Sequence, residues 1–221
     1  MMRMSFVLNV LASIVGGVLL IWLAGILSAK ARWIFTAAVA RWLDIDVEFV
    51  FRNQADAASD LQKELEGAMD ISILTGRGSE LQRETFAPLF TPRSSRGSVR
   101  ILLPDTEPPD GTYNWTDQRE NELASFDDTF GGGMLARQID TSVTFVRQQV
   151  KAGRAQLRLF NAPHIGRIVI TERYAYYTPY RDDVHGRDVR VYKFRRGDMY
   201  DNFKRLFGQL WQAEETRNPA T

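Results

Sequence analysis

The distribution of apolar and polar residues divides the chain into two parts. From Ser5 to Ala29 the sequence reads SFVLNVLASIVGGVLLIWLAGILSA, a run of 25 residues without a charged side chain. At about 1.5 Å per residue, a helix of this length crosses the roughly 30 Å hydrocarbon core of a bilayer. We therefore expect residues 1–30 to form a single transmembrane helix and the remaining chain to form a domain in water.

Beyond this segment the apolar residues recur with the periods of strands and helices. Alternation over 44–52 indicates a half-buried strand, and the four-residue spacing of Leu61, Leu65 and Met69 indicates a helix over 55–69. Further strands are expected at 70–75, 98–104, 155–160, 167–171, 174–178 and 188–194, and further helices at 80–90, 117–126, 135–151 and 198–214. The order predicts one α/β domain with a mixed sheet over 45–214, followed by a disordered tail at 215–221.

Residues 31–44 join the two parts. Trp33 and Trp42 lie near the ends of this stretch, each beside an arginine, and such side chains favour the headgroup level of a membrane. The stretch is expected to form an amphipathic juxtamembrane helix. Basic residues after the span outnumber those before it: Lys30, Arg32 and Arg41 against Arg3 and the amino terminus. This bias predicts a single-pass protein of the bacterial inner membrane with a cytoplasmic C-terminal domain.

One face of the predicted span carries small and polar residues. Asn9, Ser13, Gly16 and Gly17 fall within one sector at 100° per residue. Small residues allow helix backbones to approach closely, and an Asn amide in hydrocarbon needs a partner. We expect a homo-oligomer, a dimer or tetramer, formed through this face. Two forms remain open: a helix seam without a lumen, or a pore lined by Asn9 and Ser13.

Composition narrows the classes of function. The net charge of +1 argues against a general polyanion binder, yet 23 of the 28 basic residues are Arg, whose planar fork suits phosphate or carboxylate. The absence of Cys excludes disulfides, thiolate nucleophiles and Cys-based metal sites. The acidic residues between Asp105 and Asp128 lack metal-ligand spacing and are expected to be solvated. No metal or cofactor is predicted.

Several segments between Asp70 and Gln212 together carry a family resemblance. They are ISILTGRG, VRILLP, QLRLFNAPHIGRIVITERYAYYTPY and the closing FKRLFGQLW. This part of the chain resembles one half of the phospholipase D-like fold. The family's motif is His-x-Lys followed after four residues by Asp. Here His164 matches, but Gly166 stands in the place of Lys and Thr171 in the place of Asp.

The resemblance implies a degenerate reaction centre. In the family, His attacks the phosphorus, Lys neutralises the phosphate oxygens and Asp orients the imidazole. With Lys and Asp replaced, we expect a sensor domain without catalysis. The alternative is a membrane-bound phosphodiesterase or nuclease that uses His164, with Arg167 as a displaced cation. His185, in an Arg- and Asp-rich stretch, is expected in a solvated hairpin loop.

A phosphodiester pocket that has lost catalysis can still bind phosphates. Arg77 follows a predicted strand at the usual ligand edge of an α/β sheet, and tyrosines near residue 180 offer stacking faces. The candidate ligand-binding residues are Arg77, His164, Arg167, Tyr177 and Arg181. The structural alternative is that the tyrosines pack a sheet surface and the arginines pair with neighbouring carboxylates.

The layout of anchor and sensor resembles the membrane effectors of nucleotide-controlled bacterial antiphage defence systems. The resemblance implies a ligand-gated channel or membrane-disrupting protein, controlled by a nucleotide or oligonucleotide that a partner protein makes. A ligand can act in this way only if it binds the open and closed oligomers with different affinity. An inert anchored scaffold remains the third possibility beside effector and enzyme.

Overall fold

The computed structural model describes residues 16–17, 46–92, 97–109, 112–163, 165–181, 183–214 and 216–218. The chain divides into two compact units, Met1–Ile45 and Asp46–Thr221. Of the first unit, Gly16 and Gly17 are described, and both are helical. The other predicted membrane residues, Asn9 and Ser13, and the juxtamembrane stretch 31–44 lie outside the described residues. Among the helices that are described, none has the length and apolar character needed to cross a bilayer.

The second unit is built on a mixed sheet with strand order β1-β7-β6-β5-β2-β3-β4. Its strands are β1 (Val47–Phe51), β2 (Ile71–Leu74), β3 (Val99–Pro104), β4 (Gln156–Phe160), β5 (Gly166–Ile170), β6 (Tyr174–Pro179) and β7 (Val191–Arg195). β2, β3 and β4 pair in parallel, whereas β5 pairs with β2 in the antiparallel sense, as do β5 with β6, β6 with β7 and β7 with β1. The sheet therefore changes direction between β2 and β5.

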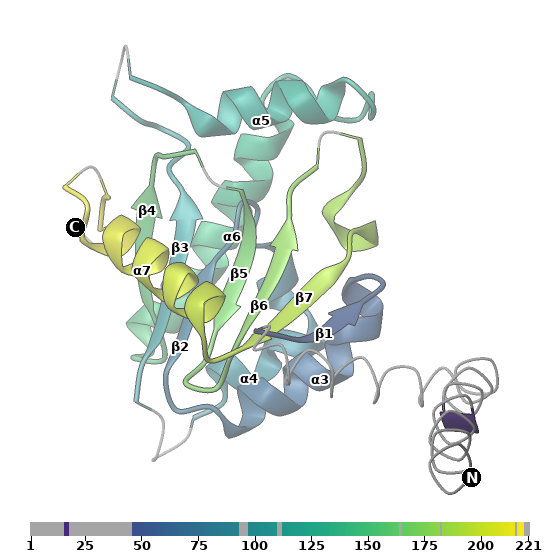
Figure 1. Cartoon of the computed structure of the whole chain (residues 1–221). Coiled ribbons are helices and arrows are strands. Elements are labelled where there is room, and N and C mark those ends of the chain that lie inside the picture. The colour runs from purple at the N-terminus through teal and green to yellow at the C-terminus, as the bar shows by residue number, and fades with distance from the viewer. Residues whose placement is uncertain are drawn as a thin grey trace, which may run out of the picture. The chain divides into compact units, whose positions relative to one another are not determined.

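Helices cover both faces of the sheet (Figure 1). On one face lie α3 (Gln54–Gly67), α4 (Ala87–Phe90) and α6 (Met134–Lys151), and on the other lies α7 (Asp198–Gln212). The helix α5 (Trp115–Ala124) lies beyond the ends of the strands at the top of the view. The core follows this arrangement: Leu65 and Ile139 pack with Ile73 on the first face, and Phe203 and Phe207 pack with Leu74 on the second.

These elements confirm the predicted mixed α/β class and most of the predicted strands and helices. The stretch 80–90 is different, because two 3₁₀ turns (Ser79–Gln82 and Glu84–Phe86) and the short α4 replace the expected helix. Leu81 and Phe86 are both buried, but five positions on one helix would separate them by about 140°. An extended residue at Arg83 turns both side chains into the core.

Part of the predicted disordered tail is held in place. The backbone of Arg217 pairs with that of Leu159 on β4, with an N···O distance of 2.8 Å in each direction. Its guanidinium Nε lies 2.6 Å from Oδ2 of Asp105, a carboxylate that is 2 % exposed. The expectation of a disordered tail is therefore wrong at Arg217. The expectation of a solvated carboxylate is wrong at Asp105, because that group is buried in an ion pair.

The N-terminus of α6 is capped by a carboxylate from α5. Three glycines with positive φ, Gly131 to Gly133, bring the chain round so that Glu120 meets the first backbone N–H groups of α6. The Glu120 oxygens accept from the backbone N–H of Gly133, Met134 and Leu135 at 2.7, 3.1 and 2.8 Å. The pairing of a buried carboxylate with helix N–H groups stabilises α6 and joins it to α5.

We expect Glu120→Ala to lower the free energy of unfolding by about 2–4 kcal/mol, because three backbone N–H groups, one of them buried and two partly buried, would lose a charged acceptor. Urea unfolding followed by tryptophan fluorescence measures the change. Asn121→Ala, on the exposed side of the same helix, is the matched control and should leave the midpoint nearly unchanged. An unchanged midpoint for Glu120→Ala would contradict the capping role.

Candidate ligand-binding site

A pocket lies where β2 ends, β5 begins and β6 ends. Leu74 of β2 pairs with Ile168, and Arg167 of β5 pairs with Thr178 of β6, so polar residues after or beside these pairs meet at one edge of the sheet. The pocket has a volume of about 690 Å³, including its open mouth. This edge holds the carboxyl end of β2 at the point where the strand direction changes, which is the usual ligand position in α/β sheets.

The Gly76-Arg77-Gly78 turn after β2 forms one wall of the pocket. A Cβ at Gly76 would lie 2.6 Å from the Trp115 ring and 2.7 Å from the Tyr180 hydroxyl, so no other residue fits there. Gly78 adopts φ +74°, a left-handed conformation that favours glycine. The tight turn places Arg77 at the pocket, where its Nη1 donates to Oε1 of Gln138 at 3.2 Å.

Arg167 lies in the pocket floor and is only 5 % exposed. Its guanidinium donates to Gln54 Oε1 and to Thr178 Oγ1, both at 3.2 Å. The carboxylate it pairs with is Glu80, whose Oε1 lies 3.8 Å from Arg167 Nη1. These contacts are long for a charged donor, because charge-assisted hydrogen bonds usually measure about 2.7–2.9 Å. The buried cation therefore keeps unused capacity for an anion.

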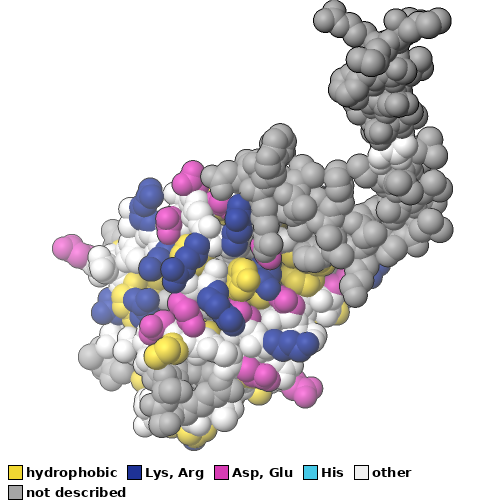
Figure 2. Space-filling view, turned by 60° about the horizontal axis from the view of Figure 1, so that its bottom comes forward, with side chains coloured by type: hydrophobic (Ala, Val, Ile, Leu, Met, Phe, Trp, Pro, Cys, Tyr) yellow, Lys and Arg dark blue, Asp and Glu magenta, His cyan; other side chains and the backbone are white. Residues whose placement is uncertain are grey.

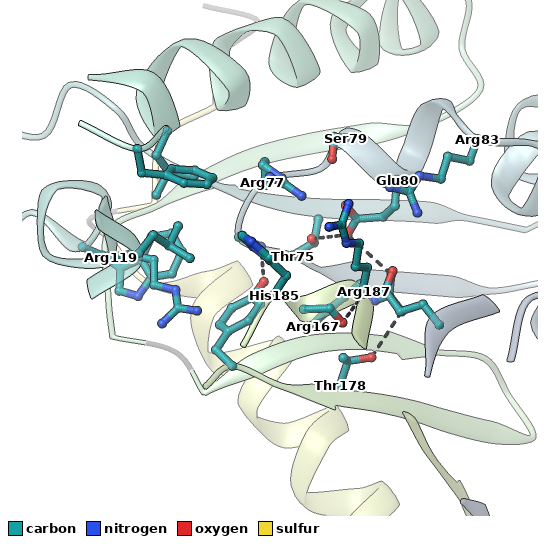
Figure 3. Close-up of a pocket in the computed structure, with 18 residues that line it drawn as sticks. Thr75, Arg77, Ser79, Glu80, Arg83, Arg119, Arg167, Thr178, His185 and Arg187 are labelled. Carbon is teal, nitrogen blue, oxygen red and sulfur yellow. Dashed lines mark hydrogen bonds and ion pairs between the residues drawn. The ribbon is translucent and has the colours of Figure 1, made fainter. Parts of the chain in front are cut away.

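Glu80 is held by a second contact with the strand end. Thr75, the residue after β2, donates its hydroxyl to Glu80 Oε1 at 2.5 Å. The two side chains and Arg167 lie close together in the pocket (Figure 3). The side chain of Glu80 is 12 % exposed, and it is the single carboxylate among the described residues that line this pocket.

Tyr180 closes the space between Arg119 and the glycine turn. Its hydroxyl accepts from the backbone N–H of Gly76 at 2.6 Å, and the Arg119 guanidinium lies 5.2 Å from the centre of its ring. Burial, together with the negative charge of Glu80, raises the pKa of Tyr180 to about 12. The phenol therefore stays neutral at physiological pH.

Further arginines make the pocket cationic. Arg77, Arg83, Arg119, Arg167 and Arg187 line it, against the one carboxylate of Glu80. Arg119 is engaged by Glu122 at 2.7 Å and by the carbonyl of Arg181 at 2.7 Å. Within the part of the chain that the structure describes, neither Arg77 nor Arg83 forms an ion pair. The excess of positive charge favours a ligand with a negative group.

Another part of the pocket lining is apolar. It is formed by α5, the loop after it and the first turn of α6, with the side chains of Trp115, Leu123, Phe130 and Leu135. Arg119 and Arg83 lie at opposite sides of the view in Figure 3, so charged groups frame the space on two sides. The pocket can therefore hold a molecule that combines an anionic group with a planar or apolar part.

His185 lies at the rim and not in a fully solvated loop. Its Nε2 lies 3.2 Å from Oδ2 of Asp127, and its ring packs edge-on against Phe126 with centroids 5.4 Å apart. Hydrogen bonds from Thr129 to Asp127 lower the pKa of that carboxyl, and His185 adds a smaller effect in the same direction. The segment around His185, expected to be a solvated hairpin loop, therefore packs against the residues that follow α5.

The structure brings together part of the predicted set of ligand residues. Arg77 and Arg167 line the pocket, whereas His164 lies outside the described residues. Tyr177 does not belong to the pocket: it faces α7, with its ring 5.0 Å from that of Phe203. Arg181 is also placed elsewhere, because it is exposed and pairs with Asp183 at 2.6 Å. Tyr177 therefore packs on the sheet surface and Arg181 pairs with a neighbouring carboxylate, as in the structural alternative given above.

Several pocket residues were not predicted as ligand residues. They include Thr75, Glu80, Arg119, Thr178 and His185. Thr75 directly follows a predicted strand, which is a usable signal for a site residue. The others come from segments far apart in sequence, and no local pattern marks them.

The structure shows the surroundings of Gly166 and Thr171, the two positions where the sequence departs from the expected motif. At Gly166 an added Cβ would collide with the backbone of Thr178 and Pro179 and with the Tyr177 ring, so a lysine has no room. Thr171 follows the far end of β5, where its hydroxyl donates to the buried Glu64 at 2.7 Å. Among the residues that the structure describes, no group of three or more His, Cys, Asp or Glu side chains could hold a metal ion.

We expect the unfolding free energy of the wild type to fall more steeply with pH than that of Tyr180→Phe between pH 10 and about 12. In this window the unfolded phenol, with its pKa of 10.0, loses its proton while the folded one keeps it, so each pH unit costs up to about 1.4 kcal/mol. Urea unfolding at several pH values measures both slopes, with pH 7 as the baseline. Parallel slopes would contradict the raised pKa.

Comparisons with known proteins give little beyond this geometry. No protein-family model matches the sequence, and no curated protein matches it. Among solved structures, the chain is similar to TrmBL2, an archaeal chromatin protein whose structure shows a novel mode of DNA binding. The match has 14% sequence identity and a TM-score of 0.46, and it covers 86% of this chain. The matched part spans 61% of the length of TrmBL2.

Proposed function

We propose that the α/β unit is a sensor that binds a phosphate-bearing ligand of the nucleotide class in the arginine-lined pocket. The observation that carries this proposal is Arg167, a buried guanidinium whose paired carboxylate is 3.8 Å away. A buried charge without a close partner is costly, and the cost falls when an anion enters the site. A phosphate that reaches Arg167 would also meet Arg77, which forms no ion pair among the described residues.

The shape of the pocket supports a nucleotide over a bare anion. The pocket is lined by charged and by apolar side chains, a combination that suits an organic ligand with an anionic group. The arginines can bind the phosphate, while the wall with Trp115 and Phe130 offers apolar and aromatic contact to a base. The phosphate and the base of a nucleotide would each contact side chains of suitable chemistry.

The face of the molecule shown in Figure 2 gives less support for a long polyanion. On the face shown in Figure 2, Lys and Arg side chains are interleaved with Asp and Glu, and no wide field of one sign is visible. Nucleic-acid backbones are usually bound through clustered basic residues. A ligand that enters a pocket fits this pattern of charge better than a duplex laid on the surface.

We further propose that this unit is a degenerate member of the phospholipase D-like fold. The crowding at Gly166 supports binding without hydrolysis, because the cation that would neutralise the reacting phosphate has no space on that residue. The alternative is a phosphodiesterase or nuclease that uses His164. In that case Arg167 or another arginine must neutralise the reacting phosphate in place of the missing lysine. The binding experiment below includes the assay that separates the two.

The effector part of the proposal rests on the sequence of the first thirty residues. An uncharged run of 25 residues supports a membrane anchor, and the small-residue face supports an oligomer. We propose that ligand binding shifts this oligomer between two states and thereby changes membrane permeability, as in the antiphage effectors with a similar layout. The ligand must then bind one state more tightly than the other.

We expect the full chain in detergent micelles to bind at least one of the four ribonucleoside monophosphates, and Arg167→Gln and Arg77→Gln to weaken binding about tenfold or more. The reason is that each variant removes a charge-assisted hydrogen bond to phosphate. Isothermal titration calorimetry measures the affinities.

The matched control is Arg181→Gln, which removes an exposed arginine outside the pocket and should leave the affinity unchanged. Absence of binding by all four nucleotides and by inorganic phosphate would contradict the proposed sensor. Cleavage of a generic phosphodiester that His164→Ala abolishes would favour the enzyme instead.

We expect expression of the full chain to depolarise bacterial cells when its ligand is present, and Asn9→Leu or Gly17→Leu to abolish the effect. Both changes place a bulky apolar side chain on the proposed helix interface. A membrane-potential dye measures the response, with Leu20→Ile as a conservative control within the same run. A wild-type chain that binds nucleotide and leaves the potential unchanged would argue for an inert scaffold.

A further inference from the structure

Glu80 occupies an unusual position in a pocket that is otherwise cationic. Five arginines line the pocket, yet among the described residues none of them lies within hydrogen-bond distance of this carboxylate, and the Arg167 guanidinium stays 3.8 Å away. The hydroxyl of Thr75 fixes Oε1 at 2.5 Å. The Glu80 side chain is 12 % exposed. It lines this pocket and also a second cavity beside α3, which Arg167 lines as well, so the carboxylate oxygens can accept further hydrogen bonds there.

An ionised carboxylate can only accept hydrogen bonds, and its two oxygens offer about four lone-pair sites. Within the described part of the chain, Thr75 is the one side chain that donates to Glu80 in a short hydrogen bond. A ligand group that binds the remaining lone pairs of Glu80 must therefore be a hydrogen-bond donor. An ammonium group would meet five arginines on its way into the pocket, whereas a neutral hydroxyl carries no such penalty.

We propose that Glu80 accepts a hydrogen bond from a sugar hydroxyl of the ligand and thereby selects ribonucleotides over their deoxy analogues. This inference rests on the proposed function and adds the sugar to it. In this proposal the phosphate binds Arg77 and Arg167, the base contacts the apolar side chains of Trp115 and Phe130, and the ribose contacts Glu80; all of these residues line the pocket. Each part of a ribonucleotide then meets the group that matches its chemistry.

The competing explanation makes Glu80 an internal anion that holds the place of the phosphate. In that case the ligand would have to displace Glu80 from Arg167, and neutralising Glu80 would strengthen the binding of every phosphate compound. The geometry favours the hydroxyl acceptor, because the short contact of Glu80 is with Thr75 and its contact with Arg167 is long. The two explanations predict opposite changes in affinity for the same variant.

The test uses the full chain in detergent micelles and isothermal titration calorimetry. The probes are AMP, 2′-deoxy-AMP, 3′-deoxy-AMP, 2′,3′-dideoxy-AMP and inorganic phosphate. We expect AMP to bind about tenfold to a hundredfold more tightly than the dideoxy compound, because a site built to bind a hydroxyl rejects the analogue without it. The two single deoxy compounds identify which hydroxyl Glu80 accepts.

Two variants connect this preference with Glu80. Glu80→Gln should reduce the preference for AMP, and Glu80→Ala should abolish it, while the affinity for 2′,3′-dideoxy-AMP changes little. Glu84→Gln neutralises an exposed carboxylate on the next 3₁₀ turn and should behave as the wild type. A thermal unfolding curve for each variant verifies that the domain is folded before affinities are compared.

The outcomes separate the inference from the function on which it rests. Equal affinity for AMP and its dideoxy analogue, with Arg167 still required, overturns the role of Glu80 and leaves the phosphate sensor standing. Tighter binding of all phosphate compounds to Glu80→Gln shows an internal competing anion and also overturns it. If neither the nucleotides nor inorganic phosphate bind, the proposed function itself is wrong.

Discussion

The antiparallel pairing of β5 with β2 brings together the polar groups on the floor of the pocket. β2 runs parallel to β3 on one side and antiparallel to β5 on the other, so the carboxyl end of β2 meets the beginning of β5. Thr75 and Arg167 meet for this reason, although they are far apart in sequence. The pocket lies beyond these two strand ends. The glycine turn, Glu80 and residues of α5 line it there.

Several carboxylates elsewhere in the domain have a cationic group close by. Glu64 lies 2.6 Å from Arg173, Asp60 lies 2.8 Å from Lys193, and Asp105 is engaged by Arg217. In the first of these pairs the arginine is about half exposed, so water shares in the solvation of the cation. Arg167 is buried and Glu80 is only 12 % exposed, and yet among the described residues theirs is the ion pair with the widest separation. This spacing leaves the Arg167 guanidinium able to bind a further anion.

The sequence was sufficient for the mixed α/β fold and for the residues next to strand ends. Strand and helix periods are local properties, and Gly76-Arg77-Gly78 directly follows an apolar strand, so Arg77 could be identified without tertiary information. Tyr177 was misplaced because neighbouring residues of a strand face opposite sides, and the choice of face depends on the register. Glu80 could not be identified, because its position depends on the replacement of a helix by two 3₁₀ turns that bury Leu81 and Phe86.

The backbone bonds between Arg217 and Leu159 have an effect on the outer strand of the sheet. β4 pairs with β3 on its inner side, so the N–H and C=O of Leu159 that Arg217 engages point away from the sheet. Free groups of this kind form a template on which a strand of another molecule can add, and proteins usually block such templates. A single residue near the carboxyl terminus provides that block here, and its ion pair with Asp105 keeps it there. The end of the chain thus protects the domain against intermolecular sheet extension along β4.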